Sequence, residues 1–135
     1  MNYPIEEIEG IGPAYGKKLI AAGVKSTGDL LKRGAKPAGR KELESASGIG
    51  HAQILKWCNL ADLMRVKGVG KQYSELLEAA GVDTIKELKN RKPENLAAKM
   101  KEVNDAKKLC RSAPSEKLVT KWVAQAKVTA PAISY

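Results

Sequence analysis

Three short segments of the chain carry two glycines separated by one branched aliphatic residue, at Gly10–Gly12, Gly48–Gly50 and Gly68–Gly70. Each segment lies between stretches with the apolar spacing of a helix. Glycine permits a turn with positive φ and places no side chain over the peptide groups. The N–H groups in the first turn of a helix lack intrahelical partners and carry the positive end of the helix dipole. Such a bend is therefore a candidate site for a phosphate oxygen.

The candidate contacts are the glycines of the three bends and the basic or polar side chains near them. They are Gly10, Gly12, Lys17, Lys18, Gly48, Gly50, His51, Lys56, Lys67, Gly68, Gly70, Lys71 and Gln72. Pro13 has no N–H, so the first bend offers one donor fewer than the third. For each lysine, a solvated position on a helix face is an equal alternative. We expect His51, the single histidine, to lie on the surface at the start of a helix and not to act as a base.

The chain contains an internal duplication. Residues 8–30 and 66–88 align without gaps at an offset of 58, and nine of the 23 aligned positions are identical. A weaker match pairs residues 47–57 with 112–122 at an offset of 65, so about seven residues are inserted and the glycines of the fourth bend are lost. Tyr15 and Tyr73 are equivalent, as are Trp57 and Trp122, and residues repeated in this way are expected to pack in the core.

The duplication predicts three segments: a first repeat at 1–62, a second repeat at 63–128 and a flexible tail at 129–135. Each repeat is marginal in size for a core of its own, so we expect the two to share an interface near residues 60–65. No segment alternates like a strand, which predicts an all-α fold. A loop is expected at 34–39, and Pro114 is expected to open the last helix.

The order of helix, glycine bend and helix resembles the helix-hairpin-helix motif, over nearly the whole chain. The string GIGPAYGKKLIAAGV also resembles a bacterial and archaeal family of unknown function that is built from duplicated hairpin pairs. The resemblance implies two tandem repeats of two hairpins each, with the fourth hairpin degenerate. In DNA-binding relatives a basic or hydroxyl residue often follows the second glycine by two or three places. This chain instead has Ala14 and Tyr15, Ala52 and Gln53, or Gln72 and Tyr73 there.

The 135 residues carry a net charge of +9, which favours a polyanionic partner. The charge is uneven: residues 1–24 and 61–88 each have a net charge of −1, whereas residues 25–60 carry +4 and residues 89–135 carry +7. Acidic residues surround the first and third bends. Two interpretations follow, in which either the basic segments face the partner with the second bend as the contact, or the first and third bends are purely structural.

Other classes of protein fit the sequence less well. No apolar run is long enough to span a bilayer, the N-terminal residues do not resemble a secretion signal, and Cys58 and Cys110 are expected to be reduced thiols, which together predict a cytoplasmic protein. We expect no metal and no cofactor. The DNA glycosylases that contain hairpins place a catalytic Asp beside one of them, but Asp83 is interpreted here as a helix cap, a role that Thr84 could equally fill.

The sequence therefore predicts a non-enzymatic protein that binds nucleic acid, duplex DNA in particular, without sequence preference. Backbone amides at the bends and the flanking lysines would contact phosphates, which carry no direct base information. The alternative is a protein-interaction or scaffolding module in which the bends only build the fold. The sequence leaves the oligomeric state open.

Overall fold

A computed structural model describes residues 2–135, and Met1, the first residue of the predicted first repeat, lies outside them. A 3₁₀ turn and eight α-helices follow one another within those residues. They are η1 Ile5–Glu7, α1 Gly12–Ala21, α2 Thr27–Gly34, α3 Pro37–Ser47, α4 His51–Leu63, α5 Lys71–Ala79, α6 Ile85–Leu88, α7 Pro93–Lys107 and α8 Glu116–Lys127. Extended pairing in this part of the chain is limited to one isolated bridge between Pro4 and Ser26, so the all-α prediction is confirmed.

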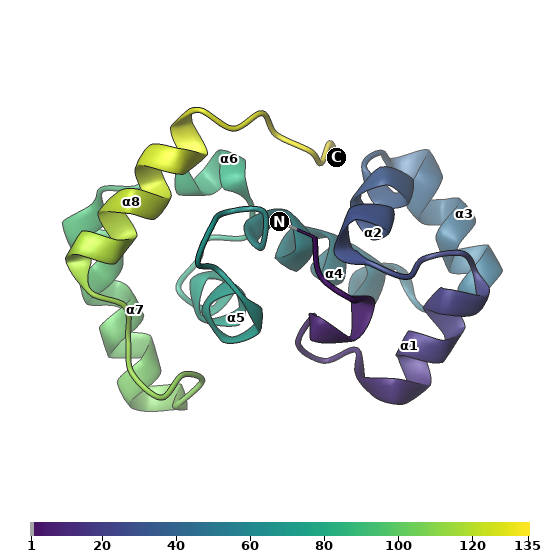
Figure 1. The fold of residues 1–135 in the computed structure, drawn as a ribbon, viewed down its shortest axis with the longest axis horizontal. Coiled ribbons are helices and arrows are strands. Elements are labelled where there is room, and N and C mark those ends of the chain that lie inside the picture. The colour runs from purple at the N-terminus through teal and green to yellow at the C-terminus, as the bar shows by residue number, and fades with distance from the viewer. Residues whose placement is uncertain (1) are drawn as a thin grey trace.

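Two lobes are visible in Figure 1, with α1–α3 gathered on one side, α6–α8 on the other, and α4 and α5 between them. None of the helices in residues 2–135 combines the length and the apolar character that crossing a membrane requires. The buried apolar side chains form two clusters, one drawn from residues 5–64 and one from residues 63–126. The boundaries of the predicted repeats stay a prediction.

Equivalent aromatic pairs lie in the two clusters. The Tyr15 and Trp57 rings are 5.2 Å apart and inclined by 62°, and the Tyr73 and Trp122 rings are 5.1 Å apart and inclined by 61°. Both pairs have the edge-to-face geometry that aromatic rings favour. Because both tryptophans are buried, the interpretation of these residues as packing residues is confirmed.

Helix α4 belongs to both clusters, since Trp57 and Leu60 lie in the first and Leu63 in the second. Its last turn also carries Asp62, which is 1% exposed. Asp62 Oδ2 accepts a hydrogen bond of 2.8 Å from the Ile85 N–H at the start of α6, and its Oδ1 accepts one of 2.8 Å from Arg65. The expected shared interface near residues 60–65 is therefore present.

In the first lobe, the N-terminal segment makes the comparable contacts with the start of α2. The N–H of Thr27, which is equivalent to Ile85, donates a hydrogen bond of 2.8 Å to the Tyr3 carbonyl oxygen, and Asn2 contacts the next residue. Asn2 Oδ1 accepts a hydrogen bond of 2.8 Å from the Gly28 N–H, at the start of α2. The N-terminal segment thus does for α2 what the end of α4 does for α6. In the second lobe, the end of α4 therefore has the position that the N-terminal segment has in the first lobe.

Two local expectations are wrong. The expected loop at 34–39 is much shorter, because α2 continues to Gly34 and Pro37 begins α3, where its missing N–H costs nothing. Pro114 precedes the last helix without opening it, since Ser115 is the N-cap of α8. Of the two residues that the sequence offers as the cap of α6, Asp83 and Thr84, it is Thr84 that accepts the hydrogen bond.

The Asp62 contact can be tested by substitution. Asp62→Ala leaves the Ile85 N–H and the Arg65 guanidinium without their acceptor, so we expect it to lower the free energy of unfolding by about 2–4 kcal/mol. Asp105→Ala is the control, since the Asp105–Lys101 pair is exposed on both sides and its loss should cost less than about 1 kcal/mol. Urea unfolding measures both changes. Equal losses for the two variants would contradict the role given to Asp62.

Candidate nucleic-acid interface

The three glycine bends share one construction. The aliphatic residue at the centre of each bend (Ile11, Ile49 or Val69) is at most 3% exposed and anchors the bend in a hydrophobic cluster. The flanking glycines lie at the surface: five of the six are exposed, and Gly70 is half-buried. Some peptide groups of the bends are used internally, because the N–H groups of Ile11, Gly48 and Val69 donate to the carbonyl oxygens of Ile8, Glu44 and Val66. The donors that a ligand could reach are therefore those at the helix starts that follow the bends.

Helices α1, α4 and α5 begin at these bends, and no side chain caps their first turn. By contrast, a hydroxyl oxygen of Ser26, Thr84 or Ser115 accepts a hydrogen bond from the first turn of α2, α6 or α8. The two remaining helices, α3 and α7, begin with a proline and are also uncapped. The first-turn N–H groups after the three bends are thus left to solvent or to a ligand.

Side chains from the first turns of α1 and α4 contact each other. Gln53 Nε2, in the first turn of α4, donates a hydrogen bond of 3.1 Å to Tyr15 Oη, in the first turn of α1. Tyr15 also packs edge-to-face on Trp57 of α4. These contacts connect the starts of the two helices through their side chains, a link that sequence reasoning missed because Gln53 and Tyr15 are 38 residues apart.

The glycines differ in why they are needed. Gly10, Gly12, Gly48 and Gly68 have φ between 62° and 91°, a range that residues other than glycine rarely adopt. Gly50 has φ −66° and Gly70 has φ −102°, both open to any residue. A Cβ added at Gly50 or Gly70 would meet no atom within 4 Å. Neither backbone geometry nor packing therefore demands a glycine at these two helix starts.

No acidic side chain within residues 2–135 forms an ion pair with the lysines near the first bend. Lys17 and Lys18 are exposed on α1, and Lys18 Nζ lies 5.7 Å from the centre of the Tyr15 ring. At the second bend, His51 is exposed as expected, and its Nδ1 lies 3.2 Å from Glu44 Oε2. A shallow hollow of about 580 Å³ beside it is lined by Lys41, Glu44, Ser45 and His51.

Lys71, assigned to the third bend, and Lys56, assigned to the second, each have an acidic partner. Lys71 Nζ lies 3.7 Å from Glu9 Oε2, and Lys56 Nζ, on α4, lies 3.7 Å from Glu78 Oε1. Lys67 is exposed, and its backbone N–H donates to Gln125 of α8. Gln72 is exposed, while its carbonyl oxygen accepts a hydrogen bond from the Cys110 thiol. The acidic residues near this bend thus pair with two of the predicted contacts.

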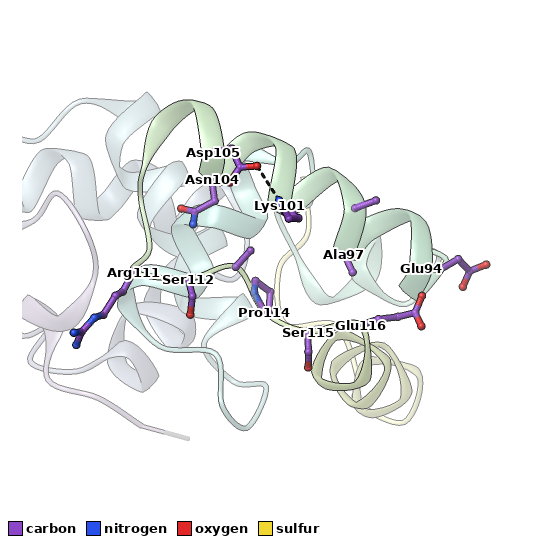
Figure 2. Close-up of a pocket in the computed structure, with 12 residues that line it drawn as sticks. Glu94, Ala97, Lys101, Asn104, Asp105, Arg111, Ser112, Pro114, Ser115 and Glu116 are labelled. Atoms are coloured by element: carbon purple, nitrogen blue, oxygen red, sulfur yellow. Dashed lines mark hydrogen bonds and ion pairs between the residues drawn. The ribbon is translucent and has the colours of Figure 1, made fainter.

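The fourth bend position has become a different structure. Ser115 caps α8, and Glu116 follows it in the first turn. Buried Asn104 exchanges two hydrogen bonds with the Cys110 backbone and so holds the inserted segment against α7. A groove of about 610 Å³ lies beside this segment. In Figure 2, Glu94 and Arg111 lie at its opposite ends, and Lys101 pairs with Asp105. The mixed charges of this groove and its capped helix do not suit a phosphate.

Both thiols are protonated at neutral pH. Burial raises the pKa of Cys58 to about 12 although the Arg40 charge opposes it, and burial raises the pKa of Cys110 with a contribution from Glu75. In the described part of the chain, no group of three His, Cys, Asp or Glu side chains is placed to hold a metal ion. Asp83, the residue weighed as a catalytic group, is exposed and accepts a hydrogen bond from the Thr84 hydroxyl.

These features define an all-helical protein with three exposed glycine bends, two of which are followed by helices whose first turns are connected by side chains. The family model described as "Domain of unknown function (DUF4332)" matches residues 9–129, and the chain belongs to this family. No curated protein and no solved structure matched the chain.

Charged residues of both lobes meet where α5 faces α4 and the first bend. Burial raises the pKa of Glu75, the nearby Glu9 and Glu78 charges raise it further, and Lys56 and Lys71 oppose the shift. A raised pKa means that the ionised carboxylate is less favourable in the folded chain than in the unfolded one. The Glu75 charge therefore lowers stability at neutral pH, and this penalty disappears as the pH falls below the usual range of a carboxyl group.

We expect Glu75→Gln to remove this penalty. At neutral pH the variant should be more stable than the natural chain by up to about 0.5 kcal/mol, a small gain because Glu75 is partly exposed. Near about pH 4 the difference should shrink, because the carboxyl group of the natural chain then takes up a proton. Glu42→Gln, at an exposed position on α3, is the control. Urea unfolding at both pH values checks the sign, and a loss of stability at neutral pH would refute it.

The second bend allows a direct test of why its two glycines differ. Gly48→Ser forces a side chain onto a residue with φ 72°, so we expect a loss of about 1–2 kcal/mol in stability. Gly50→Ser supplies a hydroxyl cap at a residue with φ −66°, so stability should stay within about 0.5 kcal/mol or rise. Because a Cβ meets no atom at either position, thermal unfolding of the pair isolates the backbone effect. Similar losses of stability in Gly48→Ser and Gly50→Ser would contradict this explanation.

Proposed function

We propose that the protein is a non-enzymatic binder of nucleic acid, duplex DNA in particular, that contacts phosphates without reading sequence. In this proposal the three bends are helix-hairpin-helix motifs in two tandem repeats, and the first repeat provides the main contact. The observation that carries the proposal is the uncapped start of α4 at Gly50, where neither φ nor packing requires a glycine. Glycine there keeps the amides accessible, as a close-lying phosphate needs.

The start of α1 supports the same interpretation. The Gln53–Tyr15 hydrogen bond connects it to the start of α4 through their side chains, so two phosphates could be met by one surface. Lys17 and Lys18 of α1 and Lys41 near His51 add positive charge around it. The net charge of +9 supplies long-range attraction to a polyanion. A cytoplasmic location, where the two thiols stay reduced, fits this proposal.

The second repeat suits a different use. Its last helix is capped by Ser115, and Lys71 of its glycine bend is paired with Glu9. These contacts favour the alternative function, a protein-interaction module, for this half of the molecule. In that case the third bend would join helices without contacting nucleic acid.

The assay for the proposed function is a salt titration with random-sequence duplexes followed by fluorescence anisotropy. For duplex DNA, the logarithm of the affinity should fall by about 0.9 per logarithmic unit of salt for each phosphate contacted. Duplex RNA in a parallel titration shows whether DNA is preferred. A flat salt dependence, or no binding of either duplex, would contradict the proposal.

A charge placed at the α4 N-cap tests the site itself. Gly50→Asp should keep or raise stability, because aspartate is a good N-cap, yet its carboxylate occupies the amides and repels phosphate. We expect duplex affinity to fall about tenfold. Ser115→Asp is the matched control, since it adds the same charge at a helix start that is already capped. An equal effect of both substitutions would show that net charge alone matters.

A further inference from the structure

Arg40 is a buried cation without an acidic partner. It lies on α3, is 2% exposed, and forms none of the ion pairs found among residues 2–135. Its Nη1 donates to the carbonyl oxygens of Gly34 and Ala35, at 2.9 and 3.3 Å, while its Nε is buried with no partner. A buried charge is costly unless it is hydrogen-bonded, so any further acceptor matters to this residue.

That acceptor comes from the end of the chain. Arg40 Nη2 donates a hydrogen bond of 2.8 Å to the Ser134 carbonyl oxygen, and the Ser134 N–H donates one of 2.8 Å to the Ala35 carbonyl oxygen. The Tyr135 ring lies 5.8 Å from the Arg40 guanidinium carbon, and its hydroxyl donates to Asn59 Oδ1 at 2.8 Å. Ile133 packs against the first hydrophobic cluster. The predicted flexibility of residues 129–135 stays a prediction, but their last three residues make specific contacts.

Residues 131–135 lie in a trough with open space on both sides. One hollow of about 320 Å³ separates them from Asp62, Thr84 and Lys86, and another of about 380 Å³ lies beside Ala35 and Lys36. Backbone hydrogen bonds hold the segment at Ser134, while the side chains on either side make separate contacts. This combination is the usual way in which proteins hold an extended peptide.

The segment reaches the trough across a connector. Helix α8 ends at Lys127 in the second lobe, and the chain then crosses to the first lobe (Figure 1). Residues 130–132 take part in none of the hydrogen bonds of the described structure. The docked residues therefore contact the first lobe, whereas helix α8, which precedes them in the chain, belongs to the second lobe. A segment connected in this way can dock on the first lobe of another copy instead of its own, as in domain swapping.

We propose that the trough around Arg40 is a docking site for residues 131–135 of a second copy of the chain, which replace the chain's own segment and produce a reciprocal dimer. Every contact of Ser134 and Tyr135 is preserved when the segment comes from another copy. An empty trough would leave Arg40 without the Ser134 acceptor, so the occupied trough is favoured. In a reciprocal dimer, the Arg40 side chains of both copies keep this hydrogen bond. This inference is independent of nucleic-acid binding.

The first experiment supplies the segment separately. A fluorescent peptide with the sequence of residues 129–135 is titrated against the full chain and against its Ser134→Pro variant, whose own segment lacks the N–H that bonds Ala35. We expect the variant to bind the peptide at least about tenfold more tightly, because the natural segment competes at an effective concentration on the order of millimolar. Asn59→Ala added to the variant should weaken binding. A peptide that binds neither chain overturns the docking site.

Light scattering of the natural chain then tests whether segments exchange between copies. The protein concentration is varied from about 10 μM to about 1 mM, the range in which a tethered segment competes. The dimer fraction should rise with concentration, and Ser134→Pro should lower it at every concentration. Ser134→Ala keeps the backbone N–H and loses only the exposed hydrogen bond of 3.3 Å from the Ser134 hydroxyl to the Ala35 carbonyl oxygen, so it should behave nearly like the natural chain. A natural chain that stays monomeric throughout overturns exchange, as does a dimer that forms equally well with Ser134→Pro.

Discussion

Helix α4 must pack into two hydrophobic clusters at once, and the rest of the structure depends on this constraint. Its first turns face the first lobe, where Trp57 packs on Tyr15, and its last turn places Leu63 in the second cluster. Asp62 adds a buried polar contact to α6 of the second lobe. The helix therefore sets the position of the Gly50 helix start and, through its far end, the position of the second lobe.

The two halves show how a duplicated unit diverges while its packing stays the same. The Tyr–Trp pairs differ by only 0.1 Å in ring separation and 1° in inclination. The helix starts differ instead: in the first half both ends are uncapped, whereas the second has Ser115 as a cap and a longer segment held by Asn104. Selection on the core and on the surface can act separately, because buried apolar contacts do not depend on how a helix end is capped.

Much of the fold could be predicted from the sequence because it depends on local chemistry. The aliphatic centres of the bends are buried, Gly23 ends α1 with φ 91°, and Ser26 caps α2, all as residue type and spacing indicate. The wrong expectations concerned helix limits. Helix α3 begins at Pro37, inside the expected loop, and Ser115 instead of Pro114 marks the start of α8 as its N-cap. Contacts between distant residues were beyond reach, as with Gln53 and Tyr15 or Glu9 and Lys71, because pairing of surface side chains leaves no periodic signal. The candidate site was thus predicted by its glycines, but not by its geometry.

The placement of the aromatic residues has a practical consequence. Each lobe contains one buried tryptophan, Trp57 in the first and Trp122 in the second, and each indole touches a tyrosine ring. The chain thus carries one intrinsic fluorophore per lobe, with a tyrosine beside it that can transfer excitation to it. Replacing either tryptophan with phenylalanine leaves an emission signal that follows a single lobe, so cooperative melting of the two lobes can be distinguished from melting in two stages.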